Sequence, residues 1–154
     1  MAKLSAGILM FRRSGASIEL FLVHPGGPFW ANKDEGAWSI PKGIYDDRED
    51  PLDAAKREFA EEVGFAPVGA FFDLGAFRQA SGKVIRAWAL QGDIDPARLK
   101  SNSFHLEWPP RSGVMQEFPE VDRAGWFSID AAKKKILKGQ VPIVLALSKM
   151  LAID

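Results

Sequence analysis

The sequence predicts a single α/β domain in which helices cover a sheet of mixed strands. Its 154 residues fit one domain comfortably. Hydrophobic residues make up 47% and charged residues 26%, a mix typical of globular proteins that excludes wholesale disorder. Short apolar runs alternate with helical patterns along the chain, and neither a repeat nor a linker interrupts them. We therefore expect one domain over residues 1–154.

The first ninety residues predict four strands, a long loop and one helix. Two apolar runs flank the turn Ser14-Gly15-Ala16-Ser17, which indicates a β-hairpin. The loop is rich in Gly and Pro, and the helix ends at Gly64, a residue type that commonly terminates helices. The strands are expected over 4–12, 18–24, 68–78 and 83–92, the loop over 25–43 and the helix over 52–63.

The last third of the chain predicts a long irregular segment, a strand and two helices. Residues 93–119 show no clear period, whereas residues 124–129 favour a strand. Asp130 is expected to cap a helix that runs through Lys138 and ends at Gly139. Pro142 is expected to open the last helix, which places Ile143, Leu147 and Leu151 on one face.

Charge and composition exclude several classes of protein. Twenty basic residues balance twenty acidic ones, and this zero net charge argues against a surface that coats nucleic acid. The absence of cysteine excludes disulfides, thiolate zinc sites and cysteine nucleophiles. The apolar N-terminal run is too short to span a bilayer, and its basic residues follow it, the wrong order for a signal peptide. We expect a cytoplasmic protein without membrane or nucleic-acid partners.

The predicted helix over 52–63 carries two different stripes. At 100° per residue, Glu58, Glu61 and Glu62 share a face separate from the apolar one. Like charges at these spacings repel one another, and a hard divalent cation such as Mg²⁺ or Mn²⁺ would turn the repulsion into attraction. A solvated acidic face is the alternative interpretation. The apolar stripe comprises Leu52, Ala55, Phe59 and Val63.

The stretch GIYDDREDPLDAAKREFAEEVGF, residues 43–65, matches the Nudix box G-x5-E-x7-R-E-U-x-E-E-x-G-U, with U apolar, at every specified position. Seven of these positions require one residue type, so chance agreement at one start point is on the order of 10⁻⁸. The chain therefore resembles the Nudix (MutT-like) hydrolases. That resemblance implies an α/β/α sandwich with a mixed sheet. The matching residues are Gly43, Glu49, Arg57, Glu58, Phe59, Glu61, Glu62, Gly64 and Phe65.

The resemblance also implies an activity, because Nudix hydrolases cleave a pyrophosphate bond in a nucleoside diphosphate linked to another group. They use Mg²⁺ or Mn²⁺ for this reaction. By resemblance, Arg57 and Glu58 act in catalysis, with Arg57 orienting the carboxylates. Glu120, six residues before Trp126, is expected to act as a base from outside the box, with Glu117 as the alternative. The metal ligands would be Glu49, Glu58, Glu61, Glu62 and the backbone carbonyl of Lys42.

Only resemblance to known families indicates the substrate. The segment that leads into the box, Trp38-Ser39-Ile40-Pro41-Lys42-Gly43, resembles the same segment in diadenosine and diphosphoinositol polyphosphate hydrolases. The chain as a whole resembles a bacterial branch of predicted nucleotide pyrophosphohydrolases. A tyrosine usual in dinucleoside tetraphosphate hydrolases after the box is replaced by Ser81-Gly82-Lys83. The expected substrate is a dinucleoside polyphosphate or a nucleoside triphosphate, and Lys42 would face its phosphate chain.

Residues 93–119 are the expected source of specificity. Phe104 and Trp108 are candidates for stacking on a base, and Lys100 and Arg111 for binding phosphate. Two other functions stay open at this point: a non-catalytic nucleotide-binding sensor and a pyrophosphohydrolase of RNA 5′ ends. The oligomeric state, monomer or homodimer, stays open too. His24 and His105 have no partner pattern, and we expect neither to be a catalyst.

Overall fold

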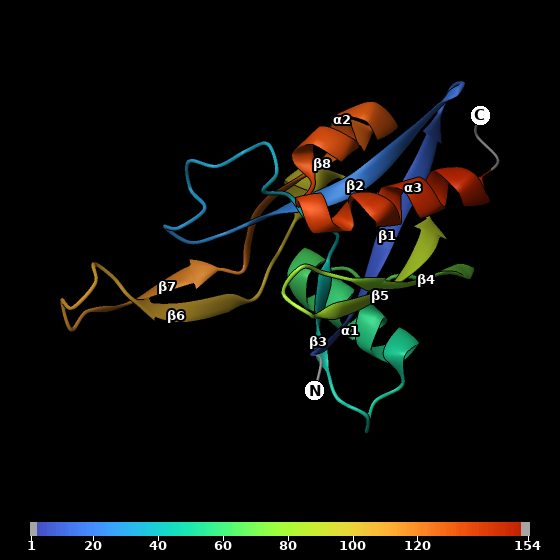
Figure 1. Ribbon diagram of the computed structural model, residues 1–154. Coiled ribbons are helices and arrows are strands. Elements are labelled where there is room, and N and C mark those ends of the chain that lie inside the picture. The colour runs from blue at the N-terminus through green and yellow to red at the C-terminus, as the bar shows by residue number, and fades with distance from the viewer. Residues whose placement is uncertain (1–2, 152–154) are drawn as a thin grey trace.

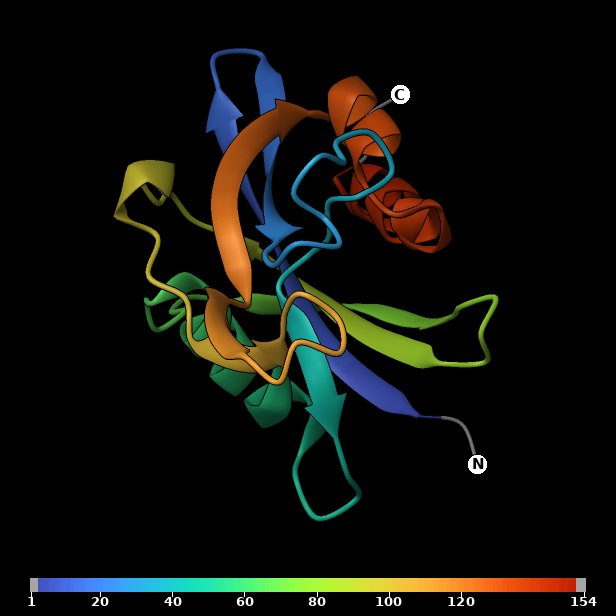
Figure 2. The ribbon, with the colours of Figure 1, turned by 90° about the vertical axis from the view of Figure 1, so that its left-hand side faces the viewer.

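The computed structural model describes residues 3–151 as three layers, with a mixed sheet between helices (Figure 1). Helix α1 covers one face of the sheet, and α2 and α3 lie on the other side (Figure 2). This arrangement confirms the predicted α/β class. The strands are β1 (Leu4–Ser14), β2 (Ser17–Pro25), β3 (Lys42–Tyr45), β4 (Phe71–Arg78), β5 (Val84–Gln91), β6 (Ser103–Glu107), β7 (Met115–Pro119) and β8 (Val121–Ser128), and the helices are α1 (Pro51–Val63), α2 (Ile129–Lys135) and α3 (Val141–Met150).

Strand β1 organises the sheet because it has three partners. The order is β4-β5-β1-β2-β8, with β3 paired to β1 outside this path. Along one edge, β1 pairs in parallel with β5 over its length. Along the other edge, Leu4–Gly7 pair with β3, whereas Phe11–Ser14 pair with β2, both antiparallel. This edge therefore forks near its middle, and β3 leads directly into the segment before α1.

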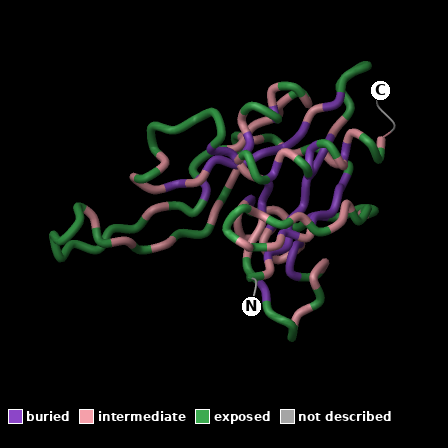
Figure 3. The backbone as a smooth tube through the Cα atoms, viewed as in Figure 1, coloured by how far each residue is buried: buried purple, intermediate pink, exposed green. Residues whose placement is uncertain are grey.

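Alternate residues of β1 supply two hydrophobic cores, as the period of a strand requires. Ile8 and Met10 pack in the cluster under α1, and Leu9 and Phe11 pack in the cluster under α2 and α3. Figure 3 shows the buried backbone concentrated in the central strands and absent from the β6–β7 hairpin. The rigid part of the molecule is therefore the sheet with its helices.

Helix α1 follows the sequence prediction closely. The side chain of Asp50 accepts the N–H groups of Leu52 and Asp53 and so caps the first turn. The helix ends at Gly64, whose φ of 91° suits a residue without a Cβ atom. Ala54, Ala55, Phe59 and Val63 are its buried residues. The expected apolar stripe is correct apart from Leu52, which is only partly buried.

The structure corrects the expectations for the segment 93–119 and for the first C-terminal helix. Strands β6 and β7 form a hairpin that projects from the body (Figure 1). The sequence signal was weak because each strand is only five residues long and neither contains a fully buried residue. Ser128, and not Asp130, caps α2, which ends at Lys135; Gly139 lies in the 3₁₀ turn Lys138–Gln140. The helix stops because the chain turns to pair with Trp38.

Among residues 3–151, none of the helices combines the length and the apolar character needed to cross a membrane.

Candidate active site

Arg57 collects three carboxylates on the exposed side of α1. Its Nε and Nη2 each lie 2.9 Å from an oxygen of Glu49, and its Nη1 lies 2.7 Å from Glu58 Oε1 and 3.4 Å from Glu61 Oε1. The bond to Arg57 lowers the pKa of Glu49, while these carboxylates, Glu49 first, raise the pKa of Arg57. The guanidinium therefore favours the ionised form of Glu49 and orients all three side chains.

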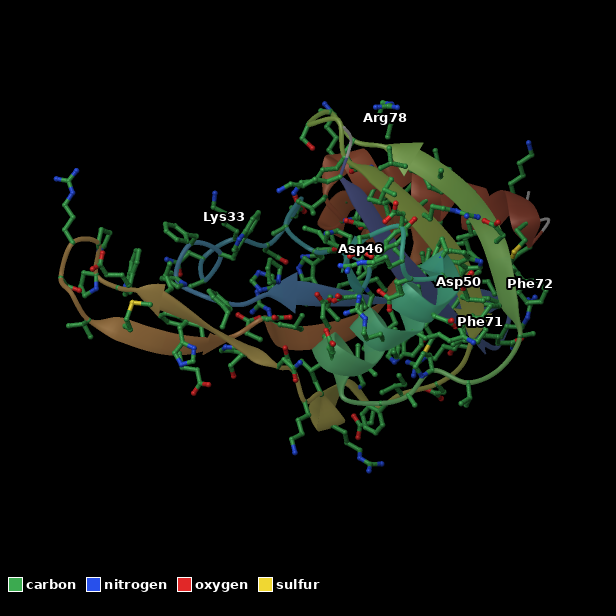
Figure 4. All side chains as sticks on the ribbon, turned by 90° about the horizontal axis from the view of Figure 1, so that it is seen from below. Lys33, Asp46, Asp50, Phe71, Phe72 and Arg78 are labelled. Carbon is green, nitrogen blue, oxygen red and sulfur yellow. The ribbon has the colours of Figure 1, made fainter. Side chains whose placement is uncertain are left out.

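Strand β3 delivers two further site residues to the same place. Lys42 and Gly43 begin β3, which pairs with the first residues of β1 and contacts α1. Gly43 lies against the carboxyl group of Glu58. Figure 4 shows Asp46 and Asp50 in the segment that joins β3 to the helix. The loop before α1 is therefore short and held at both ends, which fixes Glu49 beside Arg57.

Glu62 lies on the pocket side of α1, away from Arg57. With Lys42 and Glu120 it lines a pocket of about 200 Å³. Burial raises the pKa of Glu62 to about 8, although the positive charge of Lys42 opposes this shift. Burial likewise lowers the pKa of Lys42. The rest of the wall is mostly apolar: Val23, Pro25, Trp30, Ala37, Ser39, Val121 and Leu137.

Glu120 reaches the pocket from the end of the hairpin. Its N–H donates to the carbonyl of Asn102 (2.8 Å), and the N–H of Asn102 donates to the carbonyl of Glu61 (2.9 Å). Burial, together with the negative charges of Glu58 and Glu61, raises the pKa of Glu120. Glu117 instead lies within β7, opposite His105, and does not line the pocket. Of the two glutamates proposed from the sequence, the structure brings Glu120 to the helix carboxylates.

The chemistry of this donor set fits a hard divalent cation. Every charged donor is a carboxylate, and oxygen ligands of this kind suit Mg²⁺ or Mn²⁺. Within residues 3–151, however, no three acidic or histidine side chains already stand at metal-ligand geometry. Arg57 instead holds Glu58 and Glu61. A cation would compensate the buried charge of Glu62 and its repulsion by Glu58 and Glu120, which raise its pKa here.

A family model described as the NUDIX domain matches residues 1–147. The chain belongs to the Nudix family. The resemblance drawn from the box is thus confirmed over nearly the whole sequence, and the chain is a hydrolase acting on nucleotide pyrophosphates. The gathered box carboxylates are the structural counterpart of that assignment.

Individual proteins are similar to this chain in sequence or in fold. An uncharacterized 17.7 kDa protein of Enterobacteria phage T4 is 29% identical over 125 residues, which cover 79% of this chain and 80% of that protein. The structure of a C. elegans Ap4A hydrolase has a TM-score of 0.67 and 20% identity, covering 96% of this chain and 98% of that one. The NUDIX domain of Shewanella oneidensis NrtR, complexed with ADP ribose, has a TM-score of 0.66 and 16% identity, covering 98% and 89%.

Three of the four substrate residues expected on the segment 93–119 lie on the hairpin rather than in the pocket, and the fourth, Lys100, lies before the hairpin and does not line the pocket either. The ring of Phe104 packs against Phe118, with centroids 6.0 Å apart, and the ring of Trp108 packs against Phe29 at 5.3 Å. Arg111 is exposed in the turn between β6 and β7. None of the three is among the residues that line the pocket beside the Nudix carboxylates. Their contact with substrate stays a prediction.

Sequence reasoning missed Trp30 as a wall of that pocket. Trp30 lies in the Gly- and Pro-rich loop after β2, and it also packs against the core cluster under α2 and α3. A large aromatic residue within a loop of small residues was the available signal, because such a residue needs a partner surface.

Proposed function

We propose that this Nudix protein hydrolyses a pyrophosphate bond in a nucleotide with a polyphosphate chain, using Mg²⁺ or Mn²⁺. The best substrates are expected to be dinucleoside polyphosphates or nucleoside triphosphates. One observation carries the proposal: the carboxylates that Arg57 gathers lie beside a pocket lined by Lys42, Glu62 and Glu120 and otherwise mostly by apolar side chains. Charged groups within a mostly apolar wall match a nucleotide's phosphates and base.

Each residue receives a role from its position. Glu58, Glu61 and Glu62, with Glu49 and the carbonyl of Lys42, would hold the cation, which supplies charge neutralisation at the phosphate oxygens. Arg57 orients its carboxylate partners through charge-assisted hydrogen bonds.

The remaining two side chains serve the reacting groups. Glu120, whose pKa is raised by burial, is suited to accept a proton from the attacking water. The ammonium group of Lys42 lines the same pocket and is suited to bind phosphate as a point charge.

The fold comparisons support the substrate class in general terms. One similar structure is an Ap4A hydrolase, which agrees with the sequence motif before the box, and another is a domain complexed with ADP ribose, also a nucleotide. Both agree with a substrate that contains a nucleoside and linked phosphates.

The proposal is tested by incubating the purified protein with dinucleoside polyphosphates, nucleoside triphosphates and nucleotide sugars, each with Mg²⁺ or Mn²⁺. Turnover that stops on chelation and in Glu61→Gln and Glu62→Gln supports it. Absence of turnover for every compound contradicts it. Hydrolysis in ¹⁸O-labelled water identifies the phosphorus attacked, because only one product takes up the label.

The same samples separate the two alternative functions. Nucleotide binding that survives Glu61→Gln and Glu62→Gln, without any product, would favour a sensor. Affinity for 5′-triphosphate RNA that falls steeply with salt would favour an RNA 5′-end enzyme, because contacts to an RNA backbone release counterions.

A further inference from the structure

His24, near the end of β2, is a fully buried histidine with two polar partners. Its Nδ1 lies 2.9 Å from Asp122 Oδ1 on β8, and its Nε2 lies 2.7 Å from the backbone carbonyl oxygen of Lys33. The ring also packs edge-on against Trp38, with centroids 5.2 Å apart. His24 thus joins the sheet to the loop that follows β2, where Figure 4 labels Lys33.

The two partners determine the charge of the ring. A carbonyl oxygen only accepts hydrogen bonds, so Nε2 must carry a hydrogen. An ionised carboxylate also only accepts, so Nδ1 must carry one too unless Asp122 is protonated. The side chain of Asp122 keeps 34% of its surface in water, whereas His24 is fully buried between its two acceptors. The two contacts therefore point to a ring that donates from both nitrogens.

The bond to Lys33 fixes the middle of a loop, residues 26–36, that forms part of the pocket. The N–H of Gly26 donates to the carbonyl of Glu120, and the N–H of Gly36 donates to the carbonyl of Lys134, so both ends are held. Between these ends, the N–H of Lys33 donates to the carbonyl of Trp30 (3.0 Å). The same Lys33 residue thus bonds to Trp30 through its N–H and to His24 through its carbonyl.

Trp30 connects these hydrogen bonds to the candidate active site. It lines the pocket together with Lys42, Glu62 and Glu120. Displacement of the loop would remove an aromatic wall from this pocket and leave the carboxylates on α1 where they are, since those are held by Arg57.

We propose that His24 is a positioning residue: its doubly protonated ring, paired with Asp122, holds Lys33 and thereby sets Trp30 as the wall for the nucleoside part of the substrate. The expected effect on substrate binding rests on the proposed function, whereas the expected effect on the position of the loop 26–36 does not. His24 is expected to affect substrate binding rather than the chemical step.

The test uses two substitutions of His24 and a matched control. In His24→Asn the amide can replace Nδ1 but cannot reach the Lys33 carbonyl, so KM for the best nucleotide substrate should rise about tenfold with kcat nearly unchanged. His24→Gln places an amide near the former Nε2 and should recover most of the loss. His105→Asn, which removes the exposed histidine of β6, should match wild type. A folded His24→Asn protein with unchanged KM, or with only kcat lowered, overturns the proposal.

Two measurements need no substrate and therefore stand even if the proposed activity fails. Amide hydrogen exchange over residues 26–36 should be about tenfold faster in His24→Asn than in wild type, and near wild type in His24→Gln. Nitrogen-15 NMR of the wild-type histidine ring should show two protonated nitrogens at neutral pH. Unchanged exchange, or a single protonated nitrogen, overturns the proposal, and the NMR experiment decides this even if His24→Asn fails to fold.

Discussion

The backbone of Gly43 lies directly against the carboxyl group of Glu58. A Cβ atom at position 43 would come within 1.9 Å of Glu58 Cδ. The carboxyl group of Glu58 can therefore occupy this place only because residue 43 has no side chain. The nearest three atoms all belong to the flexible end of Glu58 and none to the backbone, so a side chain at this position displaces the carboxylate rather than the strand.

Gly43→Ala is expected to keep the fold and lose most of the activity. The added methyl group forces Glu58 out of its place beside Arg57, which removes a carboxylate from the site. Circular dichroism and turnover measurements check this. Gly92→Ala is the matched control, because its Cβ would meet only the side chain of Met10, 3.1 Å away and outside the pocket. Wild-type turnover in Gly43→Ala would contradict the role given to Glu58.

Glu120→Gln is expected to lower kcat by about 10²–10⁴-fold, the range for loss of a general base. Glu117→Gln should leave kcat unchanged, because Glu117 lies within β7 opposite His105 and does not line the pocket that Glu62 and Glu120 share. Steady-state kinetics of both variants at saturating substrate decide between them. A large effect at position 117 instead would transfer the role to that residue.

Glu62→Gln is expected to stabilise the metal-free protein while abolishing turnover. The pKa of Glu62 is about 8 in the folded chain against an ordinary 4.5, so between these values the folded state holds a proton that the unfolded state has released. The contribution of Glu62 to stability is therefore highest below pH 4.5 and falls as the pH rises to 8.

Thermal unfolding in the presence of a chelator measures this difference. The melting temperature of Glu62→Gln should exceed that of wild type by a few degrees at pH 8, since each kcal/mol shifts Tm by roughly 2–4 °C in a chain of this size. The gap should close towards pH 4.5. Equal melting curves for wild type and Glu62→Gln at pH 8 would contradict the prediction that burial of the ionised Glu62 side chain destabilises the fold.

Phe59→Ala is expected to destabilise the fold by roughly 3–5 kcal/mol, the usual cost of emptying a large buried site. Phe59 is fully buried under α1, where its ring lies 6.3 Å from that of Phe21. Phe72→Ala on β4 is the control, because 48% of that residue is exposed. Urea denaturation gives both values, and a loss at position 59 no larger than at position 72 would be inconsistent with this core.

The sequence predicted the parts of the molecule that are set locally. Helix α1 was correct to within one residue because its cap, its apolar stripe and its terminating Gly64 are all encoded in one continuous stretch. The β1–β2 hairpin was correct for the same reason, since a four-residue turn joins its strands. The Nudix box predicted which carboxylates gather at Arg57, because Glu61 lies one helical turn after it and Glu58 is its neighbour in the chain.

What the sequence left open depends on contacts between distant segments. The parallel pairing of β1 with β5 joins residues that are about eighty positions apart, and no local pattern specifies it. The pocket wall at Trp30 and the partners of His24 come from a loop with no period of its own. The hairpin of residues 103–119 was missed because the alternation in Ser103–Glu107 lasts only five residues and the partner strand Met115–Pro119 does not alternate.

The hydrogen bonds at Asn102 also bear on how this enzyme could diversify. The residue before the hairpin bonds to Glu61 on one side and to Glu120 on the other, so the chain leaves the body and returns to it at almost the same point. Residues 103–119 can consequently be shortened, lengthened or exchanged as a cassette without altering the spacing between helix and base. If these residues select the substrate, as the sequence predicts, substrate preference and chemistry are separable traits, open to independent selection or to engineering by transplanting one hairpin for another.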